Sequence, residues 1–220
     1  MSAINQWSES RLAYVHHLLY DSSSHLLYDS SSLPRGLTGL TRLSFNFYFN
    51  QPVAAGVLPA GLTKLEFGIC FNQPMAVGVL PASLTQLTFG MDFNQPVTAG
   101  VLPAGLTQLT FGDRFNQPVA AGVLPASLTQ LKFGVDFNQP VAAGVLPAGL
   151  TQLSFRDDIT DQGVQSMASL TALTTLNLRL CHLITDQGVQ SLASLTALTT
   201  LELDGCSLIT DKGARRAVPG

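Results

Sequence analysis

The sequence predicts an α/β solenoid, built from repeated units that each contribute a short strand and a return arm. The main observation is a 22-residue period, in which the pattern L-T-x-L-x-F starts at Leu40, Leu62, Leu84, Leu106, Leu128 and Leu150. The run F-N-Q-P follows in every copy but the last. A period this regular is typical of stacked repeats that bury one another. Function is therefore expected on a repeated surface rather than in a single pocket.

Each repeat, here called a rung, is expected to open with a half-buried strand. Apolar and polar residues alternate at the start of the second rung, with Leu62, Leu65 and Phe67 against Lys64 and Glu66. Pro74 and Pro81 follow only seven residues apart, and this leaves no room for a helix of normal length. The return arms of the first rungs should therefore be mostly non-helical.

The same rung predicts how the core is filled. Six of its apolar side chains are expected to point inward: Leu62, Leu65, Phe67, Phe71, Met75 and Leu80. Eleven of the twelve phenylalanines fall at two phases of the period, so they should stack from rung to rung in the interior. One rung alone buries too little apolar surface to offset the entropy of ordering its backbone. Stability must come from contacts between neighbouring rungs.

The repeat changes from about residue 156, where the spacing lengthens to 25 residues. Thr160-Asp161 and Thr185-Asp186 are good capping pairs, and each precedes a stretch with apolar residues at helical spacing, GVQSMASL and GVQSLASL. The last rungs should therefore carry short helices on their return arms.

Residues 1–36 lie outside the period and are expected to be an N-terminal cap or extension. Five apolar residues, Ile4, Trp7, Val15, Leu18 and Leu19, could form an amphipathic helix over the open face of the first rung. A disordered extension is the alternative. The organisation predicted is one continuous solenoid with an N-terminal part (1–36), a first set of repeats (37–155), and a second set with a C-terminal tail (156–220).

Composition argues against several partners and locations. The formal charge is −3 and the isoelectric point about 5.7, so neither nucleic acid nor an anionic membrane is expected as a partner. The chain shows no signal-peptide core and no apolar stretch of about 18 residues that could span a bilayer. Three cysteines, an odd number, fit a reducing compartment. The expected location is the cytoplasm, with the nucleus as the alternative.

The sequence also lacks a recognisable catalytic or metal site. Cys181, His182 and Cys206 could lie close together, but a structural zinc site needs four ligands and no fourth is evident. Cysteine catalysis needs a histidine base and a third orienting group, and phosphate-binding or hydrolase motifs do not occur. We therefore expect a protein that is not an enzyme and that carries no cofactor and no metal.

The first set of rungs, L-P-x-[GS]-L-T-x-L-x-F-G-x-x-F-N-Q-P, resembles the FNIP repeat family, with glutamine in place of isoleucine. The last part, with L-x-L-x-x-C-x-x-I-T-D-x-G-V at Leu176 and Leu201, resembles cysteine-containing leucine-rich repeats. The resemblance implies a right-handed leucine-rich-repeat horseshoe with one parallel sheet on its concave face, a role in protein binding, and no catalytic residues. It also implies a structural ladder of Asn50, Asn72, Asn94, Asn116 and Asn138, continued by Cys181 and Cys206.

Positions that differ between rungs are the best candidates for a specific binding surface. Two rows are expected to face solvent on the concave side. The first concave row is Arg42, Lys64, Gln86, Gln108, Gln130 and Gln152. The second concave row is Ser44, Glu66, Thr88, Thr110, Lys132, Ser154, Asn177 and Glu202.

A second candidate surface, here called the rim, follows directly after each strand. Its early positions are apolar (Phe47, Tyr48, Ile69 and Met91) and its later positions charged (Asp92, Asp113, Arg114, Asp136, Asp157 and Asp158). The apolar residues could anchor a partner, or Phe47, Ile69, Met91 and Val135 could point inward in a longer strand. The charges could form a solvated ion-pair ladder, or an acidic edge extending to Asp161 that receives a basic segment or a divalent cation.

Three functional hypotheses follow. The first is a protein-protein interaction module that uses the concave face. The second is an adaptor or substrate receptor of a ubiquitin ligase, and the third is a structural repeat protein with no specific ligand. The last strand, near Leu198 to Leu203, has no clear rung after it, so either the tail covers that edge or the protein self-associates there.

Overall fold

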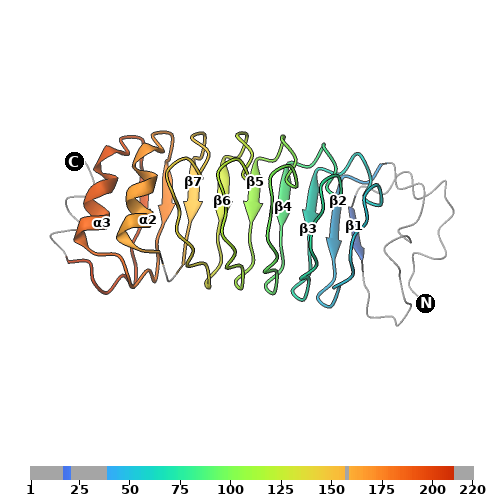
Figure 1. The fold of residues 1–220 in the computed structure, drawn as a ribbon, viewed down its shortest axis with the longest axis horizontal. Helices are drawn as coiled ribbons and strands as arrows, with labels where there is room; N and C mark the ends of the chain where they lie inside the picture. The colour runs from blue at the N-terminus through green and yellow to red at the C-terminus, as the bar shows by residue number, and fades with distance from the viewer. Residues whose placement is uncertain (1–16, 21–38, 157–158, 211–220) are drawn as a thin grey trace.

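The computed structural model describes residues 17–20, 39–156 and 159–210. They form one nine-stranded parallel sheet in which the strands follow one another in sequence order (Figure 1). The strands are β1 His17–Tyr20, β2 Arg42–Phe45, β3 Lys64–Glu66, β4 Gln86–Thr88, β5 Gln108–Thr110, β6 Gln130–Lys132, β7 Gln152–Ser154, β8 Thr175–Asn177 and β9 Thr200–Glu202. The predicted leucine-rich-repeat solenoid is confirmed.

Adjacent strands pair without any slip, so equivalent residues of each rung lie side by side. Leu65 pairs with Leu87, and the alignment continues through Leu109 to Leu201. The threonine before each strand reinforces the pairing, because its hydroxyl donates to the carbonyl of the threonine one rung earlier, as in Thr85 to Thr63 at 3.1 Å. Because of this alignment, residues at the same position of successive rungs form continuous rows on the surface.

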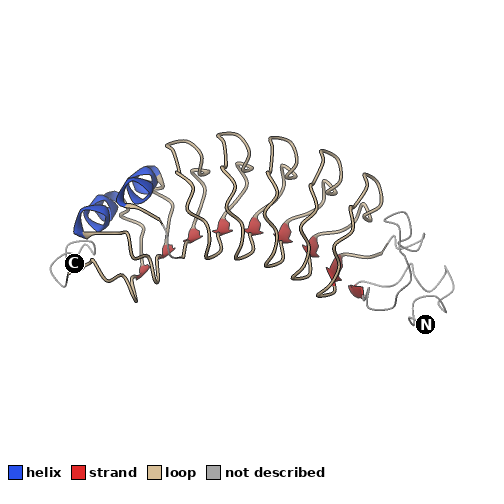
Figure 2. Ribbon diagram, turned by 60° about the horizontal axis from the view of Figure 1, so that its bottom comes forward, coloured by secondary structure: helices blue, strands red, loops and turns tan. Residues whose placement is uncertain are grey.

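The return arms differ between the two sets of rungs, as predicted. Between residues 39 and 156 they contain turns but no helix. The later arms carry α2 (Asp161–Gln165) with a 3₁₀ turn η3 (Ser166–Ser169), and α3 (Asp186–Ser191) with η4 (Leu192–Ser194). Thr160 and Thr185 cap α2 and α3 with their side chains. Figure 2 shows the helices on the opposite side of the arc from the strands.

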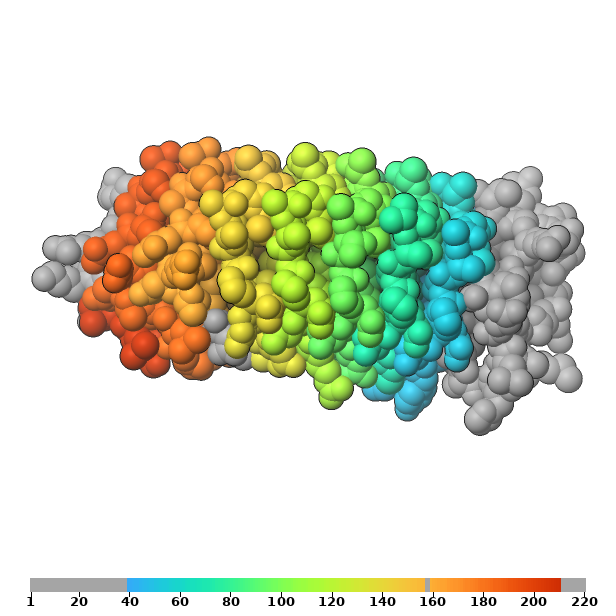
Figure 3. All heavy atoms as spheres, in the orientation of Figure 1, coloured from blue at the N-terminus to red at the C-terminus, as the bar shows by residue number. Residues whose placement is uncertain are grey.

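The core is a continuous stack of leucine and phenylalanine side chains. All six residues predicted to point inward in the second rung are buried. Within a rung the two phenylalanine rings stack closely, as in Phe89 and Phe93 with centroids 3.8 Å apart. Each ring also stacks on its counterpart in the next rung, as in Phe89 and Phe111 at 5.8 Å. The space-filling view shows the rungs as successive bands along the long axis (Figure 3).

The five asparagines of the F-N-Q-P runs form a hydrogen-bonded ladder. The Oδ1 of Asn94 accepts from the backbone N–H of Asn116 at 2.9 Å and from the Nε2 of Gln117 at 3.0 Å. The same pair of bonds joins Asn50, Asn72 and Asn116 to the following rung. The glutamine of F-N-Q-P, to which the sequence analysis gave no role, is thus the second donor at each step.

The last rungs have cysteines, Cys181 and Cys206, where the ladder is predicted to continue. Cys181 and Cys206 are buried, and the Cys206 thiol lies 3.0 Å from the carbonyl oxygen of Leu178 in the preceding rung. A second ladder is specific to these rungs. The carboxylate of Asp161 accepts from the backbone N–H and the hydroxyl of Thr185 at 2.8 and 2.6 Å, and Asp186 does the same for Thr210.

One expectation about the N-terminus is wrong. Leu18 and Leu19, predicted to lie in a capping helix, belong to strand β1, which pairs with β2. The first rung would otherwise leave the backbone groups of β2 unpaired on one side, and a four-residue strand satisfies them. The remainder of the predicted cap, with Ile4, Trp7 and Val15, lies outside the described residues. So does the C-terminal tail, residues 211–220.

Candidate functional site

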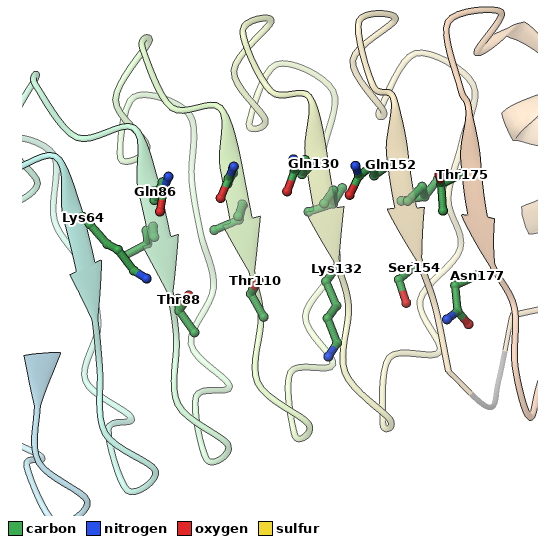
Figure 4. Close-up of a pocket in the computed structure, with 15 residues that line it drawn as sticks. Lys64, Gln86, Thr88, Thr110, Gln130, Lys132, Gln152, Ser154, Thr175 and Asn177 are labelled. Atoms are coloured by element: carbon green, nitrogen blue, oxygen red, sulfur yellow. The ribbon is translucent and has the colours of Figure 1, made fainter. Parts of the chain in front are cut away.

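The two concave rows predicted from the sequence lie in register on six or more adjacent strands. They line a shallow groove that runs from Lys64 to Thr175 and Asn177. Figure 4 shows the first row as Lys64, Gln86, Gln130, Gln152 and Thr175, with the second row nearer the carboxyl ends of the strands. The leucine between the two rows is buried in every strand from β2 to β8. The groove therefore presents only polar side chains over an apolar floor.

The glutamines of the first row are the most regular feature of the groove. Within the part of the chain that the structure describes, the side-chain amides of Gln86, Gln108, Gln130 and Gln152 form no hydrogen bond. They recur on neighbouring strands, which in a parallel sheet lie about 4.8 Å apart. An amide offers two donors and one acceptor. The groove can therefore hydrogen-bond to a polar or extended backbone ligand along its length.

The charges at the N-terminal end of the groove compensate one another. Lys64 forms an ion pair with Glu66 at 2.8 Å, and the hydroxyl of Ser44 donates to the same carboxylate at 3.1 Å. Arg42, in the first concave row, is exposed. The groove itself is therefore neutral at this end, and Arg42 adds one positive charge on the strand before it.

The C-terminal end of the groove is different, and the sequence analysis did not find it. Arg156 and Arg179 lie two positions beyond Ser154 and Asn177, and with Asp204 they form a third concave row. Earlier rungs have glycine at this phase from Gly68 to Gly134. The signal available in the sequence was the replacement of that glycine by arginine at residue 156.

The apolar rim residues are on the surface at its N-terminal end. Phe47, Tyr48 and Met91 are 50%, 67% and 42% exposed, and Ile69 is half-buried. The rings of Phe47 and Tyr48 contact each other at 4.7 Å. The alternative in which these residues point inward is wrong for Phe47 and Met91, because the strands end before the rim begins and the next residues form a turn. Val135 is half-buried.

The rim charges include one ion pair. Arg114 contacts Asp92 at 3.1 Å, whereas no ion pair joins Arg114 to Asp136 within the described ranges. Asp113 is half-buried and Asp136 exposed. Asp157 and Asp158 lie outside the described residues. Asp161 is taken up by its bonds to Thr185, so it does not extend an open acidic edge.

The geometry offers little for metal or cysteine chemistry. Among the residues the structure describes, no three histidine, cysteine or acidic side chains lie close enough to hold a metal ion. Burial raises the pKa of the Cys206 thiol, and the nearby carboxylate of Asp204 adds to the rise, against a backbone hydrogen bond that lowers it. A thiol held protonated is a poor nucleophile. No helix in the described part of the chain has the length and apolar character needed to cross a membrane.

Comparison with known proteins places the two sets of rungs in two related families. The FNIP Repeat family matches residues 30–70, 71–114 and 115–158, each match covering about two rungs. A Leucine Rich repeat family matches residues 169–193 and 194–216. No curated protein matches the chain significantly.

Two solved structures share the fold. CroV588, described as a circular leucine-rich-repeat protein, is 33% identical with a TM-score of 0.63, and the match covers 87% of this chain and 34% of CroV588. Internalin InlF from Listeria monocytogenes is 16% identical with a TM-score of 0.52, covering 83% of this chain and 60% of the internalin chain. The chain therefore spans about a third of CroV588, and its likeness to the internalin concerns the fold alone.

Proposed function

The chain belongs to the FNIP repeat family, and on that premise we propose that it is a non-enzymatic module that binds another protein on its concave face. Leucine-rich-repeat proteins generally bind protein partners, and solenoids use their extended curved surfaces for this purpose. The open groove described above is such a surface.

The observation that carries the proposal is the row of unpaired glutamine amides along β4 to β7. Amides with a structural role are hydrogen-bonded, as those of the half-buried asparagine ladder on the return arms are. The groove amides have instead no partner in the described residues, while their neighbours in the second row add hydroxyl groups. A protein segment lying across the strands would meet one amide per rung.

The apolar rim residues Phe47, Tyr48 and Met91 extend this proposed surface at its N-terminal end. Exposed aromatic side chains are frequent anchors in protein interfaces. We expect the groove to determine how the partner protein lies on the surface, and the rim residues to increase its affinity. An intracellular location is part of the same proposal, and it rests on the composition and the three free cysteines.

The test compares what the protein retains from native cell extracts when different faces are altered. Gln108→Trp with Gln130→Trp places two bulky, uncharged side chains in the groove. The matched control, Ala99→Trp with Ala121→Trp, places the same side chains at exposed positions of two return arms. We expect the groove variant to lose the reproducible partners and the control to keep them. Retention of the same partners by both variants would contradict a concave binding surface.

The same purification addresses the other two hypotheses. Ligase scaffold subunits among the retained proteins would support an adaptor or substrate receptor. No reproducible partner for the unaltered protein would support a structural repeat protein without a ligand. Self-association through the C-terminal edge stays a prediction, and light scattering of the concentrated protein would detect it.

A further inference from the structure

The charges on the concave face have the opposite sign from those on the rest of the chain. The three concave rows contain five cations and three carboxylates: Arg42, Lys64, Lys132, Arg156 and Arg179 against Glu66, Glu202 and Asp204. The net charge of these rows is +2, whereas the whole chain carries −3. The positive sign of the face is therefore not a consequence of overall composition.

Three of the five cations lie at the C-terminal end of the groove. Lys132, Arg156 and Arg179 line a hollow of about 420 Å³ together with Ser154, Asn177 and Asp204. Within the described residues neither Lys132 nor Arg156 has an ion-pair partner, and the contact of Arg179 with Asp204 is long, at 3.6 Å, between exposed groups. Exposed pairs of this kind are weak, so Arg179 can exchange its partner at little cost.

The spacing of the three cations matches the spacing of side chains along an extended polypeptide. Arg156 and Arg179 stand at equivalent positions of adjacent rungs, and strands in a sheet are about 4.8 Å apart. Lys132 stands one rung earlier and two positions back along the strand direction. Ser154 and Asn177 lie in the same row as Lys132, at the carboxyl ends of their strands (Figure 4). Carboxylates on alternate residues of a polypeptide, about 7 Å apart, can reach two of these cations at once.

The geometry points to an acidic, extended segment of the partner protein as the occupant of this hollow, with its carboxylates on Lys132, Arg156 and Arg179. The inference rests on the proposed function, because it names the chemistry of the partner that the concave face takes. It also orients the partner, since the acidic segment lies over β6 to β8 while the neutral part of the groove continues toward β3.

The test uses the full chain and fluorescence anisotropy with a labelled peptide of alternating glutamate and serine. The variant is Lys132→Gln with Arg156→Gln. The control is Ala99→Glu with Ala121→Glu, which lowers the net charge by the same two units at exposed positions of two return arms, outside the hollow. An exposed ion pair is worth up to about 1 kcal/mol, or about fivefold in affinity, so the loss of two pairs should weaken binding of the hollow variant by up to about 25-fold. The control should stay within about twofold.

Three results would overturn the inference. The first is an equal loss in both double variants, which would mean that only total charge matters. The second is equal binding of a peptide with glutamine in place of glutamate. The third is tighter binding of a poly-uridine oligonucleotide or of vesicles containing phosphatidylserine, with the same sensitivity to the hollow variant. That result would assign the hollow to a different class of ligand.

Failure of this inference and failure of the proposed function give different patterns. If Gln108→Trp with Gln130→Trp abolishes partner retention but the hollow variant leaves peptide binding unchanged, the groove binds a partner that is not acidic. If peptide binding depends on Lys132 and Arg156 but the groove variant still retains the same partners, the hollow binds acidic segments and the proposed concave interface is wrong.

Discussion

Replacing Gly112 by alanine should strongly destabilise the solenoid, because neighbouring rungs touch through their backbones at this turn. A Cβ at residue 112 would lie 1.8 Å from the carbonyl oxygen of Gly90 and 2.9 Å from the Cα of Met91. The backbone of Gly112 itself does not require glycine, since it is not among the glycines with positive φ. Alanine is excluded here because there is no room for its Cβ between the two rungs.

The cost can be estimated from the contacts that must give way. The two rungs would have to separate by ~1 Å or more, since non-bonded carbon and oxygen atoms do not approach below about 3 Å. That movement strains the bond from the backbone N–H of Arg114 to the carbonyl of Met91, at 2.9 Å, and the stacking of Phe111 on Phe89. Overpacking costs about 1 to 3 kcal/mol and a lost hydrogen bond about 1 more. We expect a total of about 2 to 4 kcal/mol.

Gly122→Ala is the matched control, because it strains the backbone without a clash. Gly122 has a φ of 81°, and nothing lies within 4 Å of a Cβ built there. A left-handed residue other than glycine costs about 1 to 2 kcal/mol. In urea unfolding followed by circular dichroism, a slope of about 3 kcal/mol per molar predicts midpoint shifts of about 1 M for Gly112→Ala and about 0.5 M for Gly122→Ala. A smaller shift for Gly112→Ala than for Gly122→Ala would refute the reasoning.

Two further predictions concern the ladders. Asn94→Ala removes the acceptor shared by two donors of the next rung and should lower the free energy of unfolding by about 1 to 3 kcal/mol in the same urea experiment. Gln117→Ala removes only one of these donors and should lower it by less. A larger loss for Gln117→Ala than for Asn94→Ala would contradict the ladder. Because burial keeps the pKa of Cys206 high, its thiol should stay protonated at pH 8, and the native protein should react quickly with a thiol reagent only at half-exposed Cys70. A second fast equivalent would contradict this.

The strands and the core could be predicted from the sequence because each follows from one short period. Alternation from Leu62 to Phe67 determines which side chains point inward, and the 22-residue repeat transfers that choice to every rung. The capping residues Thr160 and Thr185 likewise allowed the start of both helices to be predicted. In each case the residues that decide the structure are neighbours in sequence.

Features that depend on contacts between rungs were harder to predict. The role of the F-N-Q-P glutamine was missed because its partner lies 23 residues earlier. Arg156 and Arg179 were not predicted because they lie beyond the ends of β7 and β8, at a position where the earlier rungs have glycine and therefore no side chain. The strand at Leu18 and Leu19 lies outside the period, and a short apolar run does not distinguish strand from helix.

The central claim is that a partner protein lies on the concave face, and site-specific photocrosslinking tests it most directly. A photoreactive amino acid is placed at Gln108 in the groove and, in a separate protein, at Ala121 on the return arm of the same rung. Both proteins are irradiated in native extracts, and the crosslinked peptides are identified by mass spectrometry. We expect reproducible crosslinks from residue 108 to an acidic partner and none from residue 121. Crosslinks from residue 121 alone would contradict the claim.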